Sequence, residues 1–94
     1  MRVRFSAPLE AMSHGRATYL VVRLPADESG LVDDLPVLRV GFRGVRVEAA
    51  VGTTTWKTTI FPSHDGFVLL VARKVAAREM LDVGELVDVA LTVL

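Results

Sequence analysis

The sequence contains no cysteine, so it can form no disulfide framework, thiolate nucleophile or sulfur-based zinc site. Net charge is also missing: eleven Lys and Arg balance eleven Asp and Glu, and no overall field attracts nucleic acid or an anionic membrane. The longest apolar run, Phe67 to Ala72, is far shorter than the roughly 20 residues that span a bilayer. No signal-peptide pattern begins the chain. We therefore expect a cytoplasmic protein without a membrane partner.

What the sequence does contain is enough apolar material for one small core. Its 94 residues suit a single domain over residues 1–94, and 51% of them are hydrophobic, which is well outside the range of disordered chains.

Apolar and polar residues alternate with a period of two along most of the chain, which predicts mainly β-structure. Val3, Phe5 and Ala7 alternate with polar residues and predict a first strand with one wet face. A hairpin turn at Ser13–Arg16 follows, because Gly15 can adopt the positive φ of a tight turn. Further strands are predicted over residues 17–24, 45–51, 53–60, 67–71 and 86–93, the fourth of the six being stopped by Phe61-Pro62.

Helical signals are fewer. The acidic segment Ala26 to Leu35 is predicted as a helical turn within a loop, because Gly30 weakens a regular helix. The best helix covers Ala72 to Leu81, with Gly84 as its expected stop. Six short strands and one short helix before the last strand predict an all-β fold, a small closed or double-split β-barrel.

One block of sequence has a familiar pattern. Trp56-Lys57-Thr58-Thr59-Ile60-Phe61-Pro62 follows Val47–Gly52 and precedes Leu81-x-x-Gly84. The chain thereby resembles, over nearly its whole length, a bacterial family of small β-barrels known only as a domain of unknown function. The resemblance implies a double-split β-barrel akin to AbrB- and MazE-type regulators, and it implies no catalytic residues.

Three positions depart from the pattern of that family. The chain has Glu85 where the family usually has Asp, and Ala72 where it usually has valine after a proline. It has Ala76 where the family's helix usually bears an arginine, which Arg78 in the next turn could replace.

No catalytic or metal-binding constellation is predicted. Ser63-His64-Asp65 contains the residue types of a triad, but adjacent side chains diverge, and a polar turn before Gly66 is the favoured interpretation. His14 and His64 lack partners at metal-ligand spacing. We expect neither a cofactor nor an enzyme.

Five arginines are candidate contacts for an anion or nucleic acid: Arg2 and Arg4 on the first strand, and Arg39, Arg43 and Arg46 after the acidic segment. Gly41-Phe42-Arg43-Gly44 could place backbone amides near a phosphate, and it resembles the GxxG loop of KH domains. An ordinary turn and a solvated, charge-balanced face are the favoured interpretations.

Trp56 and Tyr19 are candidate lining residues of a cleft, or a stacking platform for bases. Each shares a face with apolar residues, which favours core or cleft lining.

The sequence thus predicts a non-enzymatic binding or interaction module of unknown ligand. A nucleic-acid-binding barrel with an arginine face is the alternative, and an enzyme with a cleft near Trp56 and Ser63–Gly66 ranks last. A monomer is favoured over a homodimer, because the chain has enough strands to close a barrel by itself.

Overall fold

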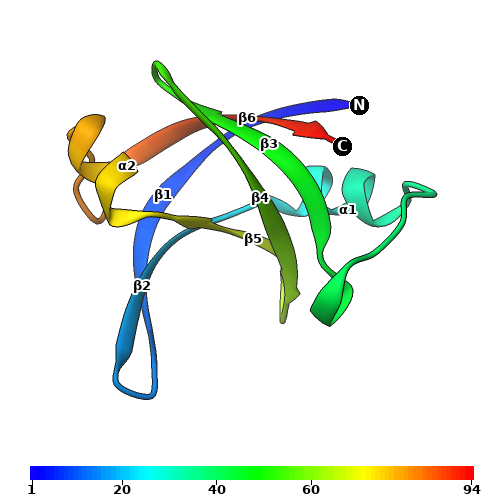
Figure 1. Cartoon of the computed structure of the whole chain (residues 1–94), viewed down its shortest axis with the longest axis horizontal. Helices are drawn as coiled ribbons and strands as arrows, with labels where there is room; N and C mark the ends of the chain where they lie inside the picture. Colours follow the sequence, from blue (N-terminus) through cyan, green and yellow to red (C-terminus); the bar gives the residue numbers. More distant parts are fainter.

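The computed structural model describes all of residues 1–94 and is a closed barrel of six strands (Figure 1). The strands follow one another around the barrel in the order β1-β2-β5-β4-β3-β6, and every neighbouring pair is antiparallel. Their bounds are β1 Arg2–His14, β2 Ala17–Arg23, β3 Val45–Val51, β4 Thr54–Ser63, β5 Gly66–Val71 and β6 Leu86–Val93. The prediction of a small closed barrel with a short helix before the last strand is therefore confirmed.

The core lies inside the barrel and is built by the predicted alternation. In β3, Val45, Val47, Ala49 and Val51 are buried while the residues between them face outward. Together with buried residues from every other strand and from both helices they form one cluster of 20 residues. Closing the sheet on itself removes most of the exposed edges that a flat sheet of this size would have.

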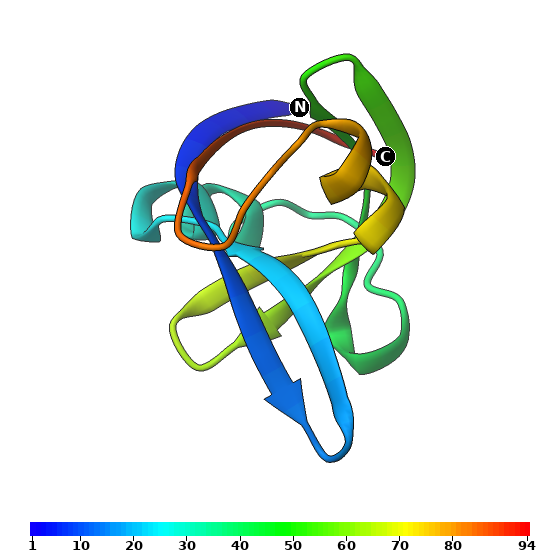
Figure 2. The ribbon, with the colours of Figure 1, turned by 90° about the vertical axis from the view of Figure 1, so that its left-hand side faces the viewer.

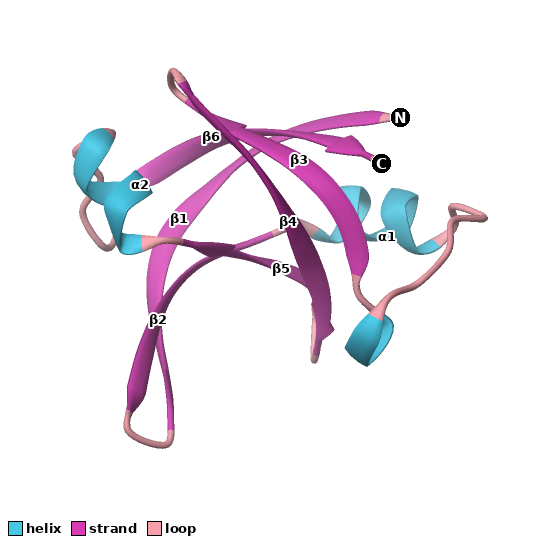
Figure 3. Cartoon of the chain, viewed as in Figure 1, coloured by secondary structure: helices cyan, strands magenta, loops and turns pink.

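Two helices lie on opposite sides of the barrel, α1 (Ala26–Asp33) and α2 (Arg73–Arg78), as the secondary-structure view in Figure 3 shows. A 3-10 turn, η1 (Gly41–Arg43), precedes β3. Both helices contribute to the core, α1 through Val32 and α2 through Val75. Neither they nor any other helix is long and apolar enough to cross a membrane.

The prediction of α1 as a mere turn within a loop was wrong, because the segment forms a regular helix of eight residues. Tertiary contacts outweigh the weak local propensity at Gly30, which is exposed. Val32 is fully buried, and the buried hydroxyl of Ser29 accepts a hydrogen bond from the backbone N–H of Phe67 at 3.1 Å. These contacts hold the helix against β5.

The end of α2 also differs from the prediction, since the helix stops at Arg78, well before Gly84. Met80 takes a left-handed conformation with φ 54°, and its N–H binds the carbonyl of Ala77. The N–H of Leu81 then binds the carbonyl of Ala76. This pair of bonds is the Schellman arrangement that ends helices, with methionine where glycine is commonest.

Pro62 does not end β4, contrary to the prediction, because the missing N–H falls where no partner strand lies. Ser63 and Gly66 flank a two-residue loop, so they exchange backbone hydrogen bonds and Pro62 points the other way. On that other side β3 begins only at Val45, opposite Ile60, so no strand lies beside Pro62. A proline is tolerated at such a position.

The hairpins extend unequally from the barrel. β1 continues to His14, beyond the predicted first strand, and forms with β2 a hairpin that projects from the barrel wall (Figure 2). Its two-residue loop uses Gly15 at φ 63°, as predicted. The two chain ends lie together, with the N–H of Val93 bonded to the carbonyl of Met1 (Figure 1).

Candidate functional site

A gap opens in the barrel wall where β5 ends. This strand lies between β2 and β4, but its last residue, Val71, pairs with Leu20 of β2. On the other side β5 pairs with β4 only from Ile60 onward. Beyond these points β2 and β4 continue without a strand between them, while the chain turns into α2.

A cleft of about 460 Å³ occupies this gap, and we call it the tryptophan cleft. Its lining comes from β2, β4 and the junction of β5 with α2, and consists of Thr18, Tyr19, Leu20, Trp56, Thr58, Leu70, Val71, Ala72 and Arg73. Most of these side chains are hydrophobic, so the cleft suits an apolar group rather than an ion.

Trp56 and Tyr19, the two residues predicted to line a cleft, both line this one. Trp56 lies opposite Ala49 in the sheet and packs, half-buried, against the core. Tyr19 lies on the outer side of β2, opposite Met12, and is 43% exposed. The two aromatics therefore approach the cleft from opposite faces of the barrel wall and do not form one stacking platform.

The only charged residue of the cleft is engaged in structure. The guanidinium of Arg73 donates a hydrogen bond of 3.1 Å to the carbonyl of Thr18. That carbonyl points toward the side on which β5 has ended, so Arg73 satisfies an edge group of β2 that no strand reaches. The cleft is thus left with a predominantly apolar surface.

A second apolar depression of about 330 Å³, the outer groove, lies on the outside of the barrel between the β1–β2 and β4–β5 hairpins. Its apolar lining is Met12, Tyr19, Phe61, Pro62, Val68 and Leu70, with Ser13, His14 and Ser63 at its polar margin. Tyr19 and Leu70 line both depressions, so the two form one apolar band across the wall.

Leu20, Leu70, Met12 and Phe61 were not predicted as site residues. A signal was present in β2 and β5, whose segments are apolar on both faces. A barrel strand whose outer face is in water needs apolar residues on its inner face only. Apolar residues on the outer face as well therefore indicate a covered or binding surface.

The five candidate arginines lie in two places, three on the outer side of the wall formed by β1, β6 and β3 and two in the loop before β3. Arg2 and Arg4 lie on the outer side of β1, and β6 separates them from Arg46 on β3. In the same cross-strand row as Arg2 lies Glu48, which faces Lys57 on its other side. In this row an acidic side chain therefore lies between the two basic ones.

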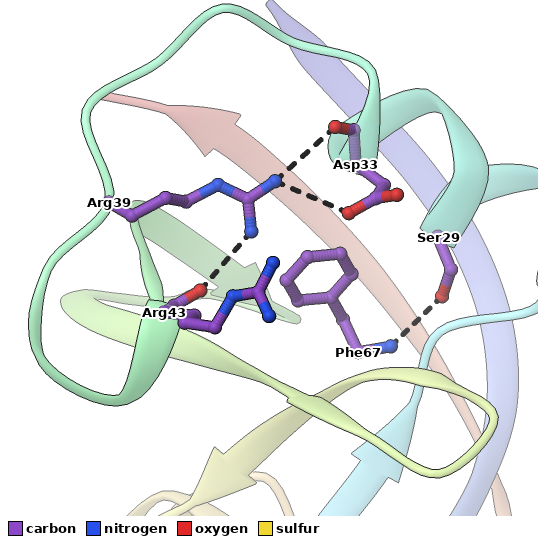
Figure 4. Close-up of polar contacts among 5 residues, drawn as sticks. All are labelled: Ser29, Asp33, Arg39, Arg43 and Phe67. Atoms are coloured by element: carbon purple, nitrogen blue, oxygen red, sulfur yellow. Dashed lines mark hydrogen bonds and ion pairs between the residues drawn. The ribbon is translucent and has the colours of Figure 1, made fainter.

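Arg39 is held by structural contacts around the loop before β3 (Figure 4). Its guanidinium donates to the carbonyl of Arg43 at 3.2 Å and to both the carbonyl and the carboxylate of Asp33 at 3.3 Å. It also lies over the ring of Phe67, 5.5 Å from the centroid. Arg43 itself is exposed and has φ 61°. Arg39 fixes this loop, which the structure shows as a 3-10 turn leading directly into β3.

The Ser63-His64-Asp65 segment is a hairpin turn. The side chains of His64 and Asp65 are 97% and 81% exposed, and Nε2 of His64 lies 4.0 Å from Oδ1 of Asp65. Ser63 lines the outer groove but not the tryptophan cleft, so the two parts of the enzyme hypothesis do not share one cleft. No group of three or more acidic, histidine or cysteine side chains gathers to hold a metal ion.

The positions that depart from the resembled family have structural roles. Ala76 is buried in the core, where an arginine would place a charge without a partner, and Arg78 is exposed. A carboxylate oxygen of Glu85 accepts a hydrogen bond of 3.2 Å from the N–H of Asp82 and so closes the turn before β6. Ala72 marks the exit from β5 into α2.

Fold and cleft together define a small closed β-barrel with an apolar band across its wall. The sequence matches the model of the family described as "Domain of unknown function (DUF1905)" over residues 5–91, and the chain belongs to this family. The predicted resemblance is confirmed to that extent. No curated protein and no solved structure matches the chain, so the likeness to AbrB- and MazE-type barrels stays a prediction.

Proposed function

We propose that this protein is a non-enzymatic binding module whose site is the tryptophan cleft. The observation that supports this proposal most directly is the meeting of Trp56, Leu20, Leu70 and Val71 in one partly open cleft of about 460 Å³. Ligand sites are typically concave, largely apolar and of this volume. The side chains that line the cleft include no acid, histidine or cysteine that could act as a base or nucleophile.

The charge arrangement favours this proposal over a nucleic-acid-binding barrel. Glu48 interrupts the row that links Arg2 to Lys57, and Arg39 is engaged by Asp33. Phosphate binding draws its affinity from several unpaired basic groups on one surface, and its strength falls steeply with salt.

An NMR screen tests the proposal. Small aliphatic and aromatic fragments are added to the ¹⁵N-labelled protein, and we expect binders to shift the amide signals of Leu20, Trp56 and Leu70. The variant Leu70→Glu should abolish these shifts, because it places a charge on the apolar band. Leu86→Glu is the matched control, since Leu86 is 71% exposed and lies outside both depressions. Binders that map only outside the cleft, or a lack of binders, would contradict the proposal.

Fluorescence anisotropy with labelled duplex and single-stranded oligonucleotides tests the competing function. We expect no binding at about 50 mM salt, where phosphate contacts are strong compared with 200 mM. Salt-sensitive binding that is lost in the double variant Arg43→Ala/Arg46→Ala would establish nucleic-acid binding instead.

A further inference from the structure

The edge of β4 next to the tryptophan cleft has no partner strand. β4 pairs with β3 over its residues from Thr54 to Ile60, but with β5 only from Ile60 to Ser63. Residues 54–58 thus have a partner strand on one side alone, and Thr59 marks the end of the β4–β5 ladder. A closed barrel otherwise leaves few such edges, because each strand lies between two others.

Hairpin geometry shows which backbone groups this edge presents. Ser63 and Gly66 flank a two-residue loop and exchange hydrogen bonds, so every second residue back along β4 points the same way. The N–H and carbonyl groups of Thr55, Lys57 and Thr59 therefore face the side on which β5 has ended. None of them takes part in the backbone hydrogen bonds outside the regular elements.

The opposite side of the gap is partly occupied by a side chain. The carbonyl of Thr18 in β2 points into the gap and accepts its hydrogen bond from Arg73. On β2 a single residue, Thr18, faces the gap, whereas β4 presents a row of N–H and carbonyl groups there that no strand covers. A row of N–H and carbonyl groups at the spacing of a strand is matched by another extended backbone, which is how peptides add to sheet edges.

The apolar cleft lies beside this edge, on the inner side of β4. Trp56 shares the cleft with Leu20 and Val71, the two residues at which β2 and β5 last pair. Lysine on an edge strand often prevents another strand from pairing with it. Here Lys57 lies opposite Glu48 on the outer face, so its side chain leaves the inner side of the edge open. A chain added to the edge would point every second side chain toward Trp56.

We infer that the tryptophan cleft takes an extended peptide segment of a partner protein, which adds to the free edge of β4 as a strand. Its backbone bonds to Thr55, to Lys57 and to the N–H of Thr59, and an aliphatic side chain enters the cleft against Trp56. This inference rests on the proposed function, because it names the ligand class of the same cleft.

The test uses the whole chain and a phage-displayed library of random dodecapeptides. Selected peptides are synthesised and titrated while the fluorescence of Trp56, the only tryptophan in the sequence, is recorded. We expect binders that shift this emission and slow the hydrogen exchange of the Thr55, Lys57 and Thr59 amides. Methylating single backbone nitrogens of the peptide should then weaken binding about tenfold at every second position and little at the positions between.

Two protein variants provide the comparison. Trp56→Ala, in which binding is followed by the amide signals of Leu20 and Leu70 instead of fluorescence, should abolish peptide binding. Phe42→Ala should not, because Phe42 is 91% exposed on the loop before β3. The N-methyl series is made on the peptide alone, so it stays decisive if Trp56→Ala fails to fold.

The outcomes separate the two proposals. Failure to select any peptide would overturn the inference, while fragment binding in the cleft would leave the proposed function standing. Peptides that shift Trp56 but ignore N-methylation would likewise show a binding cleft without strand addition. Peptides that bind and leave the signals of Leu20, Trp56 and Leu70 unchanged would overturn both.

Discussion

The carboxylate of Glu79 occupies the space that a side chain on Gly52 would need. Glu79 follows α2, whereas Gly52 lies in the two-residue turn between β3 and β4 at φ 58°. The same carboxylate accepts hydrogen bonds from the hydroxyls of Thr54 at 2.6 Å and Thr53 at 3.3 Å. A single acidic side chain thus fastens the end of α2 to the tip of the β3–β4 hairpin.

Replacing Gly52 by alanine should therefore destabilise the protein for two reasons. An L-residue at positive φ costs about 1–2 kcal/mol, and the added methyl group also displaces Glu79 from Thr54. Gly15→Ala is the matched control, because Gly15 has φ 63° but open space around its Cα. In urea denaturation we expect Gly52→Ala to lose more stability than Gly15→Ala. Equal losses would show that the Glu79 contact adds nothing.

The same contact predicts a dependence of stability on pH. The Thr54 hydroxyl holds the pKa of Glu79 below its ordinary value of 4.5, with smaller help from Thr53 and Arg78. A carboxyl whose pKa is lowered by folding stabilises the protein fully above the unfolded-state pKa. This contribution decreases as the pH falls below about 4.5 and is gone once the pH is below the folded-state pKa.

The variant Thr54→Val tests the sign and the cause. Valine keeps the shape of threonine without its hydroxyl, so the pKa of Glu79 should rise toward 4.5, as measured by NMR titration of its side-chain carboxyl carbon. The stability difference between wild type and variant should shrink on acidification from pH 7 to pH 2. A pKa that does not move in the variant would refute the assignment to Thr54.

Ser29→Ala should be costly although it removes a single oxygen atom. Ser29 is 6% exposed, and its hydroxyl donates to the carbonyl of Leu24 at 3.3 Å. The same hydroxyl accepts from the N–H of Phe67 at 3.1 Å (Figure 4). Alanine leaves a buried N–H without a partner, which costs about 1–3 kcal/mol. Urea denaturation measures the loss, and Ser13→Ala on the exposed hairpin should change stability by less than about 0.5 kcal/mol. A near-neutral Ser29→Ala would mean that the Ser29 hydroxyl does not hold the helix against β5.

These contacts show where sequence patterns suffice and where they do not. The alternation in Val45–Val51 and the glycine at 15 determine a strand face and a turn locally, so both could be predicted. The helix α1 depends on a bond between Ser29 and Phe67, which are 38 residues apart, and no local pattern contains that bond. Propensity alone therefore underestimated the helix.

The cleft could likewise be predicted only in part from the sequence. Trp56 and Tyr19 could be singled out by residue type, but the cleft exists because β5 is shorter than its neighbours. That difference comes from the register of strands that are distant in the sequence, as does the tolerance of Pro62 in β4. The surroundings of the arginines also depend on register. Arg2 and Glu48 lie in one row because both pair with Thr92 of β6, and this pairing cannot be deduced from the local sequence.

Hydrogen exchange of β4 in the protein without a ligand provides the most direct check of this register. The amides of Thr54, Trp56 and Thr58 point toward β3, so we expect their exchange to be slowed by the stability of the barrel. Those of Thr55, Lys57 and Thr59 point to the unpaired side and should exchange close to the rate of an open chain. Residue-resolved NMR exchange at neutral pH distinguishes the two sets.

The alternation of slow and fast amide exchange along β4 should end at Ile60. The amide of Phe61 faces β5 and is bonded to it, so it should exchange slowly as well. Protection at Phe61 together with fast exchange at Thr59 would place the end of the β4–β5 ladder between these two residues. Uniform protection from Thr54 to Thr59 would instead mean that α2 or a second chain covers this edge. In that case no unpaired backbone would remain for a partner to bind, and the cleft beside Trp56 would be a closed part of the barrel.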